Sequence, residues 1–178
     1  KSTPQSGTIV RTERDDAFLP KIITPIKKYG DDLIRIYIGE TNNGEKRLFY
    51  EAPADLAKEK AFIDKIHNFV DEYQNFFDKR ALRIKAIKYN PKAFYISWQA
   101  PDFASIRELI ENKPVISRAD QAILATKVCS LLKVMRGKSL VNYSIIPELV
   151  FWDQFNRVQL GGFFLHDLKE YLEIENND

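Results

Sequence analysis

Hydrophobic and polar residues alternate over two neighbouring stretches in the first half of the chain. Leu33–Gly39 and Lys46–Glu51 both show the period of a strand. Asn43-Gly44 lies between them and can supply the positive φ of a tight turn. The pattern therefore predicts a β-hairpin, preceded by a weaker strand over Lys21–Ile26 that ends at Pro25.

Two later pairs of stretches predict further hairpins. Ala81–Lys88 and Ala93–Trp98 are separated by an Asn-Pro turn. Leu149–Trp152 and Val158–Phe163 are β-branched and aromatic, and the polar residues Asp153–Asn156 form the turn between them.

A spacing of three and four residues predicts helices elsewhere. Asp55–Phe77 carries one apolar stripe and is expected to be a single long helix. Ser105–Asn112 is a short helix, and Ser117 caps a longer one that ends at Gly137. That longer helix is apolar around most of its surface, so we expect it to be nearly buried. A last short helix is expected over Asp167–Leu172.

The order of these elements predicts an α+β fold with three parts. Residues 1–17 are polar and read as a flexible tail or an extended arm, in which Thr8 is a candidate phosphorylation site. Residues 18–98 hold the first strands and the long helix, and residues 99–178 hold the remaining helices and the last hairpin.

Composition and charge narrow the function. With 27 basic and 25 acidic residues the net charge is +2, which does not indicate a nucleic-acid-binding protein. No stretch is apolar enough to span a bilayer, so we expect a cytoplasmic segment without membrane contact. His67 and His166 lie on different elements, so no metal site is expected. Cys129, the single cysteine, is expected to be a small core residue.

The segment Leu140–Phe164 resembles the catalytic segment of protein kinases. That family has a loop of the form H-R-D-x-x-P-E-N followed by a hairpin that ends in D-F-G. Pro147-Glu148 matches the P-E of that loop, and an ungapped alignment places Asn142-Tyr143-Ser144 on H-R-D and Gly162-Phe163-Phe164 on D-F-G. The order of strands and helices before this segment is also similar. The resemblance implies a two-lobed fold with a small antiparallel sheet, one long helix and a truncated helical lower lobe.

The aligned positions lack the groups that kinase chemistry needs. Ser144 replaces the catalytic carboxylate, Leu149 replaces the metal-binding Asn, and Gly162 replaces the metal-binding Asp. The lysine that pairs with phosphate falls near Tyr50 or Glu51. Leucine and glycine side chains offer no oxygen ligand for Mg²⁺. We therefore expect no enzymatic activity, no cofactor and no metal.

The resemblance implies a pseudokinase that acts as a protein-binding scaffold, and whether it forms an oligomer is left open. Minimised pseudokinase domains of this kind look like the cytosolic part of the EssB/YukC family of bacterial type VII secretion. One alternative is an atypical nucleotide-dependent transferase that binds ATP through Lys58, Lys60, Glu148 or Asp153. The other is an unrelated interaction domain.

Overall fold

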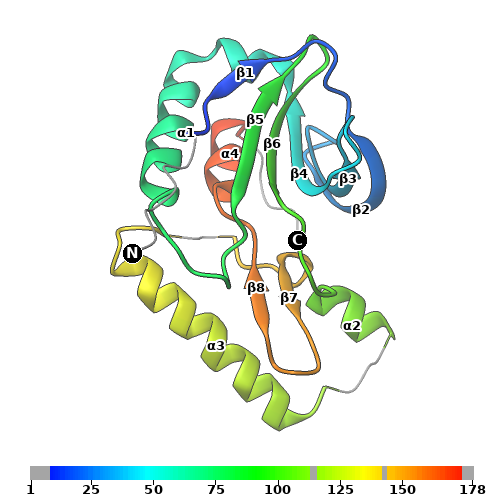
Figure 1. Ribbon diagram of the computed structural model, residues 1–178, viewed down its shortest axis with the longest axis vertical. Helices are drawn as coiled ribbons and strands as arrows, with labels where there is room; N and C mark the ends of the chain where they lie inside the picture. The colour runs from blue at the N-terminus through cyan, green and yellow to red at the C-terminus, as the bar shows by residue number, and fades with distance from the viewer. Residues whose placement is uncertain (1–8, 113–115, 142–143, 174–178) are drawn as a thin grey trace, which may run out of the picture.

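The alternating stretches of the sequence pair into a six-stranded mixed sheet in the order β1-β5-β6-β4-β3-β2. The computed structural model describes residues 9–112, 116–141 and 144–173 (Figure 1). Its class is α+β, as predicted. The strands of this sheet are β1 (Thr12–Arg14), β2 (Lys21–Tyr29), β3 (Ile34–Glu40), β4 (Lys46–Pro53), β5 (Ile84–Tyr89) and β6 (Ala93–Gln99).

Both predicted hairpins of the sheet are confirmed. β3 pairs with β4 and β5 pairs with β6, each antiparallel. Gly44 has a φ of +80°, as the first turn requires. The predicted end of the first strand at Pro25 is wrong, because β2 continues to Tyr29. A proline is tolerated there because β2 is an edge strand, where one side of the backbone makes no ladder.

Part of the polar N-terminal stretch adds a strand to the opposite edge of the sheet. Thr12–Arg14 forms β1, which pairs parallel to β5. The sheet is therefore mixed, and the expectation of a purely antiparallel sheet was wrong. The Thr12 N–H donates to Nε2 of His67 at 3.2 Å, which ties β1 to the neighbouring helix. Thr8, the candidate phosphorylation site, lies outside the described residues.

Helices and a second, two-stranded sheet complete the fold. The second sheet pairs β7 (Val150–Trp152) with β8 (Val158–Leu160), which confirms the predicted last hairpin with shorter strands. The helices are η1 (Ala54–Lys58, 3-10), α1 (Lys60–Tyr73), α2 (Ile106–Asn112), α3 (Arg118–Arg136), η2 (Pro147–Leu149, 3-10) and α4 (Leu165–Tyr171).

The predicted long helix Asp55–Phe77 is shorter and interrupted. Glu59 has an extended backbone and separates η1 from α1. Because of this break, Leu56 lies in the separate turn η1, where its side chain packs into the core and is 3% exposed. Phe77 lies beyond the helix and is 72% exposed, so its place in the apolar stripe was wrongly predicted. The stripe itself is confirmed, since Phe62, Ile66, Val70 and Tyr73 are buried.

The main core lies between the sheet and the helices α1 and α4, which Figure 1 shows together on one side of the sheet. Trp98 of β6 packs on Tyr73 of α1 and on Phe163, with ring centroids 5.8 and 6.0 Å apart. Lys65 of α1 forms a 3.0 Å ion pair with Asp167 of α4. The C-terminal helix is therefore held against α1. The sequence pattern did not predict this contact.

The helix α3 begins at its predicted cap but is not nearly buried. The Asp120 N–H donates to Oγ of Ser117 at 3.1 Å, which confirms the cap. Within α3 only Leu131 and Met135 are buried. Cys129 is exposed and is not the core residue that was predicted. The reason is that α3 meets the rest of the described chain along one side only, near β8, and runs away from the sheet (Figure 1).

Among the described residues no helix combines the length and the apolar character that a bilayer crossing needs.

Candidate functional site

The four sequence-predicted positions Tyr50, Ser144, Leu149 and Gly162 meet where the sheet joins the β7–β8 hairpin. The Gly162 N–H donates to the hydroxyl oxygen of Tyr50 at 2.9 Å. The Gly161 N–H donates to the carbonyl oxygen of Leu149 at 2.8 Å. Tyr50 and Leu149 are fully buried, and Ser144 is 6% exposed. The sequence alignment therefore selected residues that are neighbours in space.

The backbone geometry of the junction requires glycine at position 162. Gly162 has a φ of +84°, in the left-handed region that favours glycine. A Cβ built there would lie much closer to the carbonyl oxygen of Ser144 than the 3.0 Å below which real Cβ contacts are almost never found. Burial raises the pKa of Tyr50 above its ordinary value, so its phenol stays neutral. Tyr50, Ser144, Leu149 and Gly162, the described residues that define this junction, carry no charged side chain, and a side chain at residue 162 would have no room.

The second candidate for the phosphate-pairing position, Glu51, faces the other side of β4. Its carboxylate forms an ion pair with Arg35 and accepts a hydrogen bond from the hydroxyl of Tyr37 at 2.7 Å. Of the two candidates, Tyr50 is therefore the one at the junction. Asn142 and Tyr143, which were aligned with H-R, lie outside the described residues.

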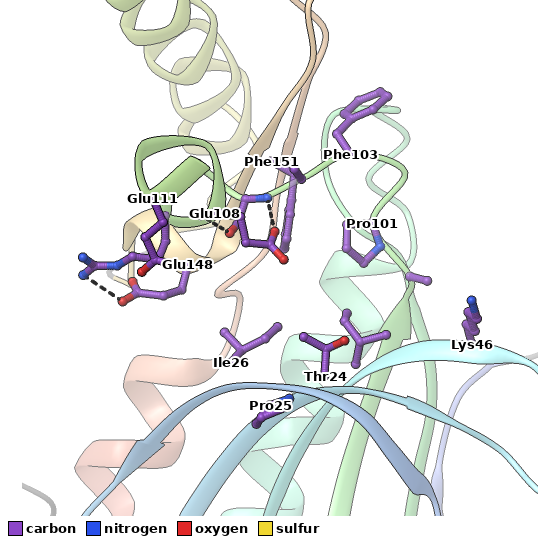
Figure 2. Close-up of a pocket in the computed structure, with 15 residues that line it drawn as sticks. Thr24, Pro25, Ile26, Lys46, Pro101, Phe103, Glu108, Glu111, Glu148 and Phe151 are labelled. Carbon is purple, nitrogen blue, oxygen red and sulfur yellow. Dashed lines mark hydrogen bonds and ion pairs between the residues drawn. The ribbon is translucent and has the colours of Figure 1, made fainter. Parts of the chain in front are cut away.

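Beside the junction, a cleft of about 530 Å³ opens between the sheet and the elements below it. The strands contribute Thr24, Pro25, Ile26, Ile38 and Lys46. The segment after β6 together with α2 contributes Ala100, Pro101, Phe103, Ala104, Ser105, Arg107, Glu108 and Glu111, and the lining is completed by Glu148 of η2 and Phe151 of β7. Figure 2 shows Glu108, Glu111 and Glu148 together, facing Pro25 and Ile26 of β2. The cleft thus combines apolar walls with carboxylates.

Glu148 is the one buried carboxylate among the residues that line this cleft. Its residue is 8% exposed, and it sits in η2 directly after Pro147. Its Oε1 atom lies 3.2 Å from a guanidinium nitrogen of Arg107 and 3.9 Å from Nζ of Lys27. Its Oε2 atom is buried and has no hydrogen-bond partner within the described part of the chain. A buried carboxylate oxygen without a donor is costly, so a ligand that donates there would relieve that cost.

Two pairs of hydrogen bonds hold the segments that line the cleft. The Ser105 N–H donates to Oε2 of Glu108 at 2.7 Å, and the Glu108 N–H donates to Oγ of Ser105 at 3.2 Å. This reciprocal capping box begins α2. The side-chain amide of Gln159 also meets both the backbone N–H and the carboxylate of Asp102, each at 2.7 Å, so the hairpin holds the segment after β6. The Ser-x-x-Glu spacing at residues 105–108 is the pattern that could have revealed this part of the site, although no prediction was based on it.

The residues named for an atypical nucleotide site are not gathered here. Glu148 lines the cleft, whereas Lys58 forms an ion pair with Asp55 at 2.7 Å. Asp153 forms its own pair with Arg157 in the hairpin turn at 2.6 Å. Within the described ranges, no group of three or more His, Cys, Asp or Glu side chains is arranged to hold a metal ion.

No protein-family profile matches this chain, and no curated protein sequence is significantly similar to it. Its own residues and their geometry therefore carry the functional argument.

Proposed function

We propose that this chain is a catalytically inactive domain with a two-lobed, protein-kinase-like arrangement, and that it serves as a protein-interaction or assembly module. The hydrogen bond between Gly162 and Tyr50 carries the proposal. It joins the residue aligned with the metal-binding Asp to the residue aligned with the phosphate-pairing Lys. Two positions that are 112 residues apart in sequence would be in contact only by chance if the alignment were meaningless.

The same junction supports the loss of catalysis. Phosphoryl transfer needs a carboxylate beside the acceptor hydroxyl and oxygen ligands for Mg²⁺. Ser144 supplies no carboxylate, the side chain of Leu149 has no oxygen, and a side chain at residue 162 would collide with the carbonyl oxygen of Ser144. In this backbone an aspartate could not return to position 162 without rearrangement. The junction has become a structural contact.

The charge of the neighbouring cleft supports a role in binding something other than nucleotide. Glu108, Glu111 and Glu148 line it together with Lys46 and Arg107. Arg107 already forms an ion pair with Glu148. The two other carboxylates of the cleft, Glu108 and Glu111, would therefore repel a triphosphate. An apolar and acidic cleft on a domain without catalytic groups is better suited to a polypeptide partner.

Thermal unfolding with millimolar ATP, with and without Mg²⁺ or Mn²⁺, tests this proposal. A nucleotide at ten times its Kd would add about 1.4 kcal/mol of stability, which would raise Tm by about 3–6 °C in a chain of this size. We expect no such rise relative to samples that contain the metal alone. We also expect no transfer of labelled γ-phosphate to the chain itself. A metal-dependent rise of that size, or transfer of the label, would refute the proposal.

A further inference from the structure

The unpartnered oxygen of Glu148 points to the chemistry of a ligand for the cleft. The side chain of Glu148 is 10% exposed, so it is shielded from bulk water. Arg107 and Lys27 both lie near its Oε1 atom and hold the carboxylate in place. The Oε2 atom is left buried and without a donor among the described residues. Because that atom has almost no accessible surface, a ligand with an N–H donor reaches it only when the Glu148 side chain turns toward the cleft. Such a donor would remove the cost of leaving the oxygen unpaired.

We propose that the cleft binds a segment of a partner protein in which an arginine lies between apolar residues, with its guanidinium donating to Oε2 of Glu148. A guanidinium is planar, carries five N–H donors and is less strongly hydrated than an ammonium group. It can also stack on aromatic rings, and Phe103 and Phe151 both line the cleft. Glu108 and Glu111 carry further negative charge on the same side, which attracts the incoming cation (Figure 2).

The size and walls of the cleft suit the residues that flank such an arginine. A volume of about 530 Å³ holds more than one side chain. Pro25, Ile26 and Ile38 form an apolar wall opposite the carboxylates. The guanidinium of such an arginine would therefore pair with Glu148, and the apolar residues on either side of it would pack on this wall.

The position of β2 favours an extended polypeptide over a small amine. β2 is the last strand of the six-stranded sheet, and its residues Thr24–Ile26 line the cleft. The free side of an edge strand can pair with the backbone of a further strand. Ile22 and Ile23 of the same strand are 43% and 42% exposed, so apolar surface continues along this edge. This inference rests on the proposed function, because it names the kind of partner that the module would bind.

Backbone amide NMR of the chain, titrated with short synthetic peptides, tests the inference directly. The probe is Ac-Leu-Arg-Leu-NH₂, and its matched control replaces arginine with citrulline, which has the same shape without the charge. We expect saturable shifts at residues 24, 26, 102–108 and 148–151 with the arginine peptide. The citrulline peptide should bind about tenfold more weakly, because charge-assisted hydrogen bonds are about twice as strong as neutral ones. Equal binding of the two peptides, or shifts spread over the whole surface, would overturn the inference.

Two further arms separate an extended segment from other ligands. N-acetyl-arginine methylamide carries the charge without the apolar neighbours and should bind more weakly than the tripeptide. If it binds equally well, the cleft is a site for a small cation and the inference is wrong. Added salt should weaken the arginine peptide more than the citrulline peptide, since screening acts on the charged contact.

Two variants of the chain test whether Glu148 is the residue that binds the arginine of the peptide. Glu148→Gln keeps the shape and one oxygen but removes the charge, and it should lower the affinity for the arginine peptide about tenfold. Glu72→Gln, on the exposed surface of α1, is the matched control and should leave the affinity unchanged. Because Glu148 also pairs with Arg107, the fold of the variant is checked by circular dichroism. Should Glu148→Gln fail to fold, the comparison of arginine and citrulline peptides on the unaltered chain still decides the question.

The outcome for the peptide and the outcome for nucleotide are independent. If ATP with Mg²⁺ stabilises the chain, the proposed function fails whatever the peptides do. If neither nucleotide nor the arginine peptide binds, this inference fails and the loss of catalysis stands.

Discussion

Replacing Gly162 with alanine tests the geometry of the junction most directly. The residue has a φ of +84°, and an added Cβ would fall far inside the contact limit with the carbonyl oxygen of Ser144. A non-glycine residue in the left-handed region costs about 1–2 kcal/mol. Forcing an atom into a packed core costs about 1–3 kcal/mol more, since the neighbouring backbone must move. Gly162→Ala should therefore lower the free energy of unfolding by about 2–5 kcal/mol.

A second glycine supplies the matched control for this change. Gly44 has nearly the same φ, +80°, but a Cβ there would meet its nearest neighbour, Oε1 of Glu40, at 3.5 Å. That is an ordinary van der Waals contact, so Gly44→Ala should cost only the backbone strain of about 1–2 kcal/mol. The difference between the two variants isolates the collision with Ser144.

Equilibrium unfolding in urea measures both variants on one scale, because the midpoint and slope give the free energy of unfolding. Thermal unfolding should show a drop of about 2–8 °C for Gly44→Ala and a clearly larger one for Gly162→Ala. Equal losses in the two variants would mean that Gly162 has free space beside it. The close approach of residues 144 and 162, and the argument that an aspartate cannot stand there, would then be wrong.

Other predictions follow from single contacts. Tyr50→Phe removes the acceptor of the Gly162 N–H and leaves that donor buried, so it should cost about 1–3 kcal/mol in the same urea assay, and a neutral result would contradict the hydrogen bond. Met135→Ala should lower the free energy of unfolding by about 2–5 kcal/mol, because Met135 is 1% exposed. Ile123→Ala should lower it by less than about 1 kcal/mol, because Ile123 of the same helix is 37% exposed. Similar losses in the two variants would show that α3 is packed on both sides. Burial lowers the pKa of His67 below its ordinary value of 6.5, so the unfolded chain binds the proton more readily, and stability should fall as pH drops through 6.5 toward the pKa of the folded state. An NMR titration of the His67 ring with a pKa at or above 6.5 would refute this.

The hairpins and caps of this fold were readable from the sequence because they depend on neighbouring residues. Asn43-Gly44 fixes its turn through the conformational freedom of glycine, whatever the rest of the chain does. Ser117 caps α3 through a hydrogen bond that spans only three residues. The spacing of the Pro-Glu segment also selected the residues that meet at the junction.

The extent of burial was not readable, because it depends on which elements lie opposite. The apolar pattern of α3 predicted a nearly buried helix, yet Cys129 is exposed. The pattern shows which residues of a helix are apolar, but it does not show how many other elements pack against the helix. The long helix was predicted through Glu59 and Phe77 for a related reason. Its stripe has the right period on both sides of the break, so the period alone does not place the ends of the helix.

The sequence by itself determined the α+β class, the order of the elements and the fact that positions 144, 149 and 162 carry no carboxylate or amide side chain. Only the tertiary structure decided that Gly162 donates to Tyr50, that α4 packs on α1 and that Glu148 is buried at a cleft with an unpartnered oxygen. Local patterns fix local structure because turns and caps involve residues a few positions apart. A cleft is formed by elements far apart in sequence, and its shape follows from how their surfaces pack together.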